Sequence, residues 1–255
     1  MYVHNINPVL LSLGPLQIRY YGLVYVLGFI IAFFVLDHYR KKGEIKITKD
    51  DMYNLIIYII LGVVIGARLF EVLVWNPAYY FQYPAKIVAF WEGGMSFHGG
   101  LIGILVVGWL FCRAKKIKLA KLADILTIPA VFILALGRIA NFINGELWGT
   151  VTNVPWCVQF KGADGCRHPA QLYGSAKRFA IFFFLIFVNR KKHKDGFIFW
   201  MFVLLFGIGR FFLDFVRENQ RLFGLSMGQY LSLAMVIAGA IILVKYYWKD
   251  LKTML

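Results

Sequence analysis

Seven apolar stretches, each long enough to cross a lipid bilayer as a helix, constrain this chain more than any other feature. A helix rises about 1.5 Å per residue, so about 20 apolar residues cross the hydrocarbon core. Hydrophobic residues make up 60% of the 255 residues, and the mean hydropathy is +0.66, which exceeds what a soluble core of this size needs. We therefore predict an all-α, polytopic membrane protein. Its spans are placed near residues 18–36, 52–75, 97–112, 122–143, 170–188, 196–216 and 226–246.

The sequence has no fixed-period repeat and no low-complexity tract. We therefore expect a single integral membrane domain over residues 1–255, with loops near residues 76–96 and 144–169. The second loop is long enough to fold over the membrane surface.

Lysine and arginine gather after the odd-numbered spans and at the C-terminus. They are Arg40, Lys41, Lys42, Lys46 and Lys49, then Arg113, Lys115, Lys116, Lys118 and Lys121, then Arg190, Lys191, Lys192 and Lys194, and finally Lys245, Lys249 and Lys252. Basic loops stay on the cytoplasmic side, so we predict an outer N-terminus, a cytoplasmic C-terminus and two outward-facing loops in the plasma membrane. The net charge of +15 is then explained by the basic cytoplasmic segments and their contact with anionic lipid of the inner leaflet. No nucleic-acid partner is expected.

Three arginines lie inside apolar spans: Arg68 in "GARLFEVL", Arg138 in "ALGRIANFINGELWG" and Arg210 in "GIGRFFLDFVRENQ". Each follows the predicted cytoplasmic start of its span by roughly 14–17 residues, so all three reach a similar depth in the outer half of the bilayer. An intramembrane arginine is costly and commonly faces a partner or an aqueous cavity. Three at one depth predict a site for an anionic ligand.

The alternative is that each arginine is neutralised by a nearby carboxylate. The candidate pairs are Arg68 with Glu71, Arg210 with Asp214, and Arg138 with Glu146. For a single arginine the two interpretations are balanced.

The residues after Arg138 favour the ligand site. Asn141, Asn144 and Glu146 follow it closely, and Gly145 is predicted to end the helix. Buried polar groups grouped in this way need partners.

A histidine among glycines, His98 of "EGGMSFHGGLIG", opens the third span on the same predicted outer side, as His168 and Gln171 open the fifth. Helix N-termini offer unpaired N–H groups and a positive dipole end, which suit phosphate. Gly99 and Gly100 would let a ligand approach the backbone closely. Small residues also mark helix packing, and a lone histidine is more often structural, so both interpretations stay open.

The fifth span is interrupted by Lys177 and Arg178, which we interpret as an interfacial end with both cations extended outward. The histidines show no metal-ligand spacing, so no metal and no cofactor are expected. Cys112 lies apart from Cys157 and Cys166, which share one outer loop and leave a disulfide between them open.

Six motifs then carry a resemblance over nearly the whole chain. In order they are "YYGLVYVLGF", "GARLFEVL", "WEGGMSFHGGLIG", "GRIANFINGELWG", "RHPAQLYG" and "GRFFLDFVRE". Together they resemble the prolipoprotein diacylglyceryl transferase family, and the third and fourth motifs are highly specific. The resemblance implies transfer of the sn-1,2-diacylglyceryl group from phosphatidylglycerol to the thiol of a lipobox cysteine in a prolipoprotein signal peptide. The implied products are a thioether and glycerol 1-phosphate.

Carried over position by position, the resemblance implies that these residues are functional: Tyr21, His98, Arg138, Asn141, Glu146, Gly149 and Arg210. One departure is Asp214, where the family usually has a glutamate, so its pairing with Arg210 is in doubt. We add Asp214 and Arg68 to the predicted substrate-binding residues.

This family assignment fits the chemistry of the residues. The nucleophile arrives on the substrate, so the enzyme needs no serine or cysteine of its own. His98 is the candidate base or thiolate-stabilising group. Arg138 and Arg210 are the candidates to hold phosphate, while Asn141, Glu146 and Tyr21 would bind the head group or position the arginines.

A transporter for an anionic lipid or small anion would also bury arginines. Transporters commonly place their sites near the midplane between inverted repeats. The odd number of spans, the lack of a repeat and the bias of polar residues toward one side disfavour that class.

Overall fold

The computed structural model describes residues 2–14, 16–90 and 93–254. Within them, seven helices are long and apolar enough to cross a membrane, which confirms the predicted helical, multi-pass class. The chain divides into two compact units, one of Met1–Ala32 with Ala123–Leu255 and one of Phe33–Leu122. The orientation of the termini stays a prediction.

The unit of residues 33–122 contains the end of α1 (Tyr20–Lys41), α2 (Lys49–Phe70), the π-helix η1 (Glu71–Trp75), α3 (Pro77–Gln82), the 3-10 helix η2 (Pro84–Val88) and α4 (Phe97–Lys115). Thr48 starts α2 with a capping box. The backbone N–H of Asp51 donates to the Thr48 hydroxyl, and the backbone N–H of Thr48 donates to the Asp51 carboxylate. Lys116 ends α4 in the left-handed region.

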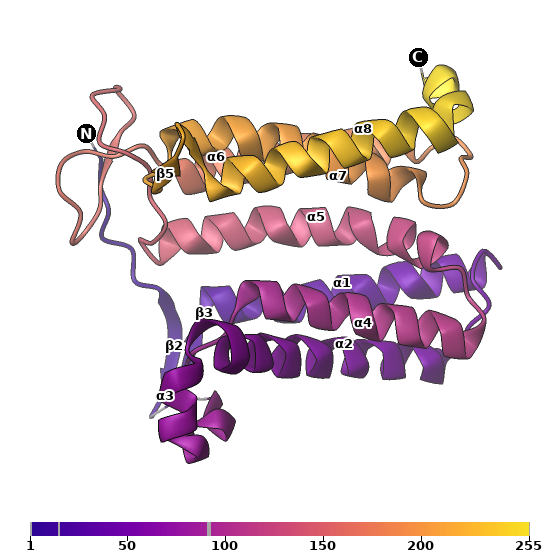
Figure 1. The fold of residues 1–255 in the computed structure, drawn as a ribbon, viewed down its shortest axis with the longest axis horizontal. Coiled ribbons are helices and arrows are strands. Elements are labelled where there is room, and N and C mark those ends of the chain that lie inside the picture. Colours follow the sequence, from indigo (N-terminus) through magenta and orange to yellow (C-terminus); the bar gives the residue numbers. More distant parts are fainter. Residues whose placement is uncertain (1, 15, 91–92, 255) are drawn as a thin grey trace. The chain divides into compact units, whose positions relative to one another are not determined.

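Helices α2 and α4 pack side by side through glycines (Figure 1). A Cβ on Gly99 would collide with the backbone of Gly66, and one on Gly103 would collide with Gly62. The close approach of two helix backbones requires such residues. The packing interpretation of the "HGG" glycines is therefore confirmed for Gly99.

The unit of residues 1–32 and 123–255 holds the remaining long helices. With the first part of α1, they are most of α5 (Leu119–Ile143), α6 (Ala170–Val188), α7 (Phe197–Leu213) and α8 (Met227–Met254), and the three-residue 3-10 helix η4 (Asp214–Val216) follows α7. Three short pairs of strands flank them: β1 (Tyr2–Val3) with β4 (Val158–Gln159) in parallel, and β2 (Val9–Leu13) with β3 (Leu16–Arg19) and β5 (Arg221–Leu222) with β6 (Leu225–Ser226) antiparallel.

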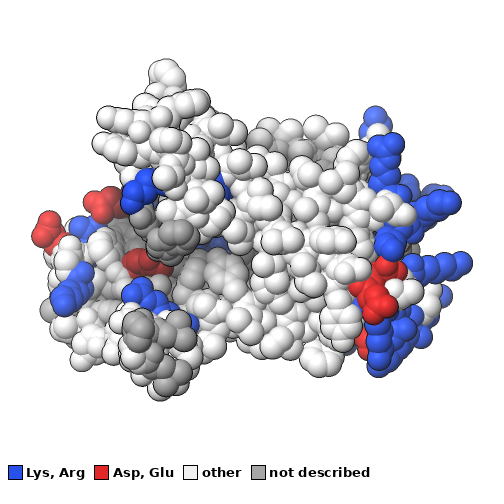
Figure 2. All heavy atoms as spheres, turned by 90° about the horizontal axis from the view of Figure 1, so that it is seen from below, with Lys and Arg blue, Asp and Glu red and all other residues white. Residues whose placement is uncertain are grey.

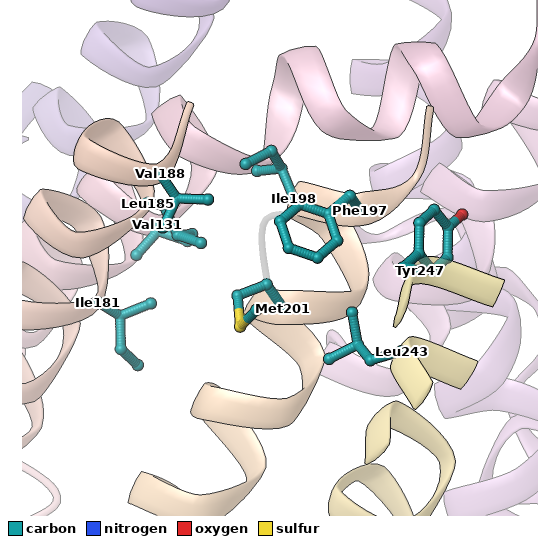
Figure 3. Packing of buried hydrophobic residues seen from close by; sticks show 9 residues of the cluster. All are labelled: Val131, Ile181, Leu185, Val188, Phe197, Ile198, Met201, Leu243 and Tyr247. Carbon is teal, nitrogen blue, oxygen red and sulfur yellow. The ribbon is translucent and has the colours of Figure 1, made fainter. Parts of the chain in front are cut away.

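The core of this unit is an apolar cluster formed by the middle of α5, the second half of α6, the start of α7 and the second half of α8 (Figure 3). Leu185, Phe197 and Ile198 are almost completely buried there. The carboxylate of Asp124 accepts the N–H groups of Gly196 and Phe199, so α5 caps the start of α7. This contact fixes the register of α7, whose far end holds Arg210.

The predicted spans match the helices to within three residues except at two ends, because α1 and α8 continue further beyond their apolar stretches. Their last turns are basic, with Arg40 and Lys41 in α1 and Lys252 in α8. Positive side chains favour a helix C-terminus, so the helix extends past the span. Figure 2 shows Lys and Arg gathered where helices end, with largely uncharged surface along the helices.

Candidate functional site

Arg138 lies five residues before the end of α5 and begins a polar network. Its Nη1 donates to Asn141 Oδ1 at 3.3 Å, and Asn141 Nδ2 donates to Glu146 Oε1 at 2.7 Å. Asn144 Nδ2 reaches the same carboxylate oxygen at 3.1 Å. Arg138 therefore contacts a neutral amide, and the Glu146 carboxylate acts through Asn141.

The turn after α5 gives this network its shape. Gly145 has φ +68°, so the helix ends in the left-handed region as predicted. Gln171, which is 1% exposed at the start of α6, donates from Nε2 to the backbone oxygen of Glu146 at 2.5 Å. Helices α5 and α6 thus fix the backbone that presents Glu146.

Arg210 forms the ion pair with Asp214 that was considered as the alternative to a ligand site, and this answers the doubt about their pairing. Its Nη2 lies 3.1 Å from Asp214 Oδ1, and the Asp214 side chain is fully buried. Ser226 Oγ donates to Asp214 Oδ2 at 2.5 Å, and Arg217 Nη1 lies 3.8 Å from Oδ1. The shorter aspartate therefore still pairs with Arg210, and Ser226 fixes its other oxygen.

Gly149 is a packing position in the loop after α5. Its N–H donates to His168 O at 2.9 Å, and a Cβ there would lie 2.5 Å from Val216 O and 2.7 Å from His168 Cβ. Any larger residue would push apart the segments around His168 and Val216. Gly149 thus joins the α5–α6 loop to η4, which follows α7.

A disulfide joins Cys157 and Cys166 within that loop and settles the open question of their pairing. Arg167, which follows it, is 7% exposed and forms an ion pair with Glu218 at 2.5 Å. These bonds hold the loop against the segment that follows η4.

Tyr21 lies in the first turn of α1 and is half-buried. Its hydroxyl accepts a hydrogen bond from Tyr25 Oη at 3.1 Å. An apolar groove of about 390 Å³ runs between this part of α1 and the end of α5, with Leu27, Leu136 and Ile139 in its lining.

In the other unit, Arg68 has partners that the sequence did not indicate. It is 3% exposed, and its guanidinium donates to backbone oxygens of Lys86, Ile87, Ala89, Gly93 and Gly94. The carboxylate of Glu71, the partner considered above, accepts from Asn76 Nδ2. Arg68 therefore organises the loop between α3 and α4.

His98 lies in the first turn of α4, beside the residues that end α2. Its ring centroid is 6.2 Å from that of Phe70 and 6.3 Å from that of Trp75. Trp75, placed by the π-helix, donates from Nε1 to Ser96 Oγ at 3.0 Å, and Ser96 also accepts from Gly99 N–H. One first-turn donor is therefore already occupied. Trp91 and Glu92 of the same motif lie outside the described residues.

Lys177 and Arg178 correct the prediction that both cations extend outward from α6. Arg178 is 3% exposed and donates to Gly174 O at 2.7 Å, while Lys177 Nζ is buried. The hydropathy of a span does not show which helices pack against it. The sequence therefore could not reveal that α7 covers the side of α6 that carries Lys177 and Arg178.

The hydrogen bonds and ion pairs of the predicted residues thus form separate groups. Arg138, Asn141 and Glu146 share one network, and Arg210 pairs with Asp214 in the same unit. Arg68 and His98 belong to the other unit. The sequence argument missed two partners of Asp214, which are Ser226 and Arg217. No motif marks Ser226, although Arg217 at i+3 was a visible signal.

Known proteins then identify the chain. A family model described as prolipoprotein diacylglyceryl transferase matches residues 8–245. The phosphatidylglycerol–prolipoprotein diacylglyceryl transferase of Geobacter sulfurreducens is 43% identical over 242 residues, covering 92% of this chain and 93% of the relative. Relatives of that name from Bordetella parapertussis (43% identical; 92% and 94% covered) and Nitrosomonas europaea (42%; 97% and 92%) are similar. The chain belongs to the prolipoprotein diacylglyceryl transferase family.

Proposed function

We propose that this protein transfers the sn-1,2-diacylglyceryl group of phosphatidylglycerol to the lipobox cysteine of prolipoproteins, the first step of bacterial lipoprotein maturation. The substrates follow from the names of relatives that cover nine-tenths of the chain. In the structure, the main support is Arg138, an intramembrane cation whose hydrogen-bond partner is a neutral amide. Such a cation retains its charge for an anionic ligand.

In the proposed reaction, the cysteine sulfur forms a bond to the glyceryl carbon, and the C–O bond to phosphate breaks. The phosphate keeps the electron pair and leaves as glycerol 1-phosphate. Arg138 and Arg210 hold the phosphate and stabilise its growing charge. His98 takes the thiol proton or stabilises the thiolate. Asn141 and Glu146 position Arg138.

The remaining predicted residues have supporting roles in this proposal. Tyr21 contacts the head group, Asp214 orients Arg210, and Gly149 holds the outer loop in place. The groove between α1 and α5 provides an apolar surface for an acyl chain, because its lining includes Leu136 and Ile139, which lie on either side of Arg138 in the sequence of α5. Arg68 acts on the substrate through the loop that it organises.

The test is an assay with purified protein, phosphatidylglycerol labelled in its acyl chains, and a lipobox peptide. A transferase forms thioether-linked peptide and glycerol 1-phosphate in equal amounts, and a peptide with serine in place of cysteine forms neither. Movement of lipid between leaflets without product would instead assign the protein to the transporter class.

We also propose that the N-terminus and the active site face the outer side of the plasma membrane, as the basic residues at helix ends support. Single cysteines at Asn153 and Lys116, both exposed, should then differ toward an impermeant maleimide added outside cells. Asn153→Cys should react, and Lys116→Cys should react only after lysis. The background needs only Cys112→Ala, because the disulfide keeps Cys157 and Cys166 unreactive. The reverse pattern would overturn the orientation.

A further inference from the structure

Lys177 places a buried ammonium group on α6, and no ion pair joins it to a carboxylate of the described residues. Its Nζ has no hydrogen-bond partner among the described residues and lies 4.6 Å from the centroid of the Phe206 ring. A ring face attracts a cation, but it does not replace the lost hydration. A charge buried in this way lowers stability, so a ligand that neutralises it is a natural explanation.

The nearest charged neighbours of Lys177 are also cations. Arg178 lies over the same Phe206 ring, with its guanidinium carbon 5.2 Å from the centroid. A Cβ on Gly209 would collide with the Lys177 side chain, which therefore crosses α7 one residue before Arg210. The Lys177 side chain therefore lies between Arg178 of α6 and the part of α7 that holds Arg210.

A second glycine brings the α5 arginine to the same place. A Cβ on Gly174 would lie 3.0 Å from Arg178 Nη1 and 3.6 Å from Arg138 Cγ. Helices α5, α6 and α7 therefore bring four cations together. The buried carboxylate beside them, Asp214, pairs with Arg210 and Arg217. Positive charge remains in excess.

We propose that Lys177 is a further phosphate-binding residue of this site and donates to a phosphate oxygen of the lipid alongside Arg138 and Arg210. This inference rests on the proposed function and deepens it. A phosphodiester carries one negative charge, whereas the released phosphate monoester carries nearly two near neutral pH. The Lys177 ammonium group would stabilise the additional negative charge on the leaving phosphate. The positive charge of Arg178 would stabilise it further.

Binding of phosphatidylglycerol without peptide tests this. Lys177→Met keeps an unbranched apolar stem out to Cε and removes the ammonium group, and Lys245→Met removes an exposed lysine of α8 as the matched control. Native mass spectrometry across a phosphatidylglycerol titration gives Kd, and Tm reports folding. We expect Lys177→Met to raise Kd about 10-fold or more, the loss of one charge-assisted hydrogen bond. Its Tm should stay equal or rise, and Lys245→Met should bind as the wild type does.

An unchanged Kd in Lys177→Met would overturn the proposal. Lys177 would then be a buried charge that lowers the stability of the fold and has no role in binding. Weaker binding together with a lower Tm would also overturn it, because the stem of Lys177 would then support α7. The same titration is run with glycerol 1-phosphate. If Lys177→Met weakened the binding of glycerol 1-phosphate but not that of phosphatidylglycerol, the site would belong to the free phosphate and the proposal for the lipid would be wrong. Because no peptide is present, a failed thioether assay with normal lipid binding would count against the proposed reaction only.

Discussion

Arg138→Lys should lose most transfer activity although it keeps the positive charge. A lysine lacks the planar fork that holds two phosphate oxygens at once, and it cannot bind Asn141 and phosphate in the geometry of a guanidinium. Loss of a donor pair that acts in the transition state costs about 2–4 kcal/mol, and Arg138→Ala should be as severe or worse. Initial rates against phosphatidylglycerol concentration measure the effect in kcat and KM.

Arg210→Lys is the matched control, because Arg210 already has an oriented carboxylate partner. Asp214 is buried and held by Ser226, so an ammonium group at position 210 still finds an anion nearby. We therefore expect a milder loss than at Arg138. Wild-type kcat and KM in Arg138→Lys, with unchanged Tm, would make Arg138 a structural charge and remove bidentate phosphate binding from the proposal.

The sequence predicted those features that depend on local patterns. Apolar length located seven helices, and Gly145 ended α5 where expected. The i,i+4 spacing of Arg210 and Asp214 raised their ion pair as an alternative, and the structure contains it. In each case the partners lie within a few residues of one another, so helix geometry alone brings them together.

Features that depend on distant segments were not predictable in this way. Arg68 binds carbonyl oxygens 18–26 residues away, and backbone oxygens carry no sequence signature. The burial of Lys177 and Arg178 depends on Phe206 in another helix. Gly99 had two interpretations in the sequence, and only the position of Gly66 on α2 decided between them.

These contrasts separate arginines that build the fold from those available to a ligand. The five carbonyl oxygens around Arg68 use its donors fully, since a guanidinium has five N–H groups. Among the described residues, the hydrogen bond of the Arg138 guanidinium goes to the amide of Asn141. An anionic substrate therefore gains more at Arg138 than at Arg68, although both are intramembrane arginines in specific motifs.

His98→Ala should reduce transfer strongly and leave the fold nearly unchanged. The His98 side chain is exposed, while the α2–α4 contact depends on glycines such as Gly66 and Gly103. Removing a general base typically lowers the rate about 10²–10⁴-fold. His38→Ala is the control, because His38 is an exposed histidine of the same unit with no proposed role.

His98→Gln then separates proton transfer from shape. Glutamine keeps a polar side chain beside Phe70 and Trp75, but an amide takes no proton near neutral pH. We expect no rescue, and we expect kcat to fall more than the affinity for phosphatidylglycerol, since the thiol proton belongs to the peptide. Peptide turnover and lipid Kd, measured on the same preparations with Tm, give this comparison. If His98→Gln or His98→Ala turned over at a near-normal rate, His98 would leave the proposed mechanism, and its motif would be explained by the packing of α4 on α2 alone.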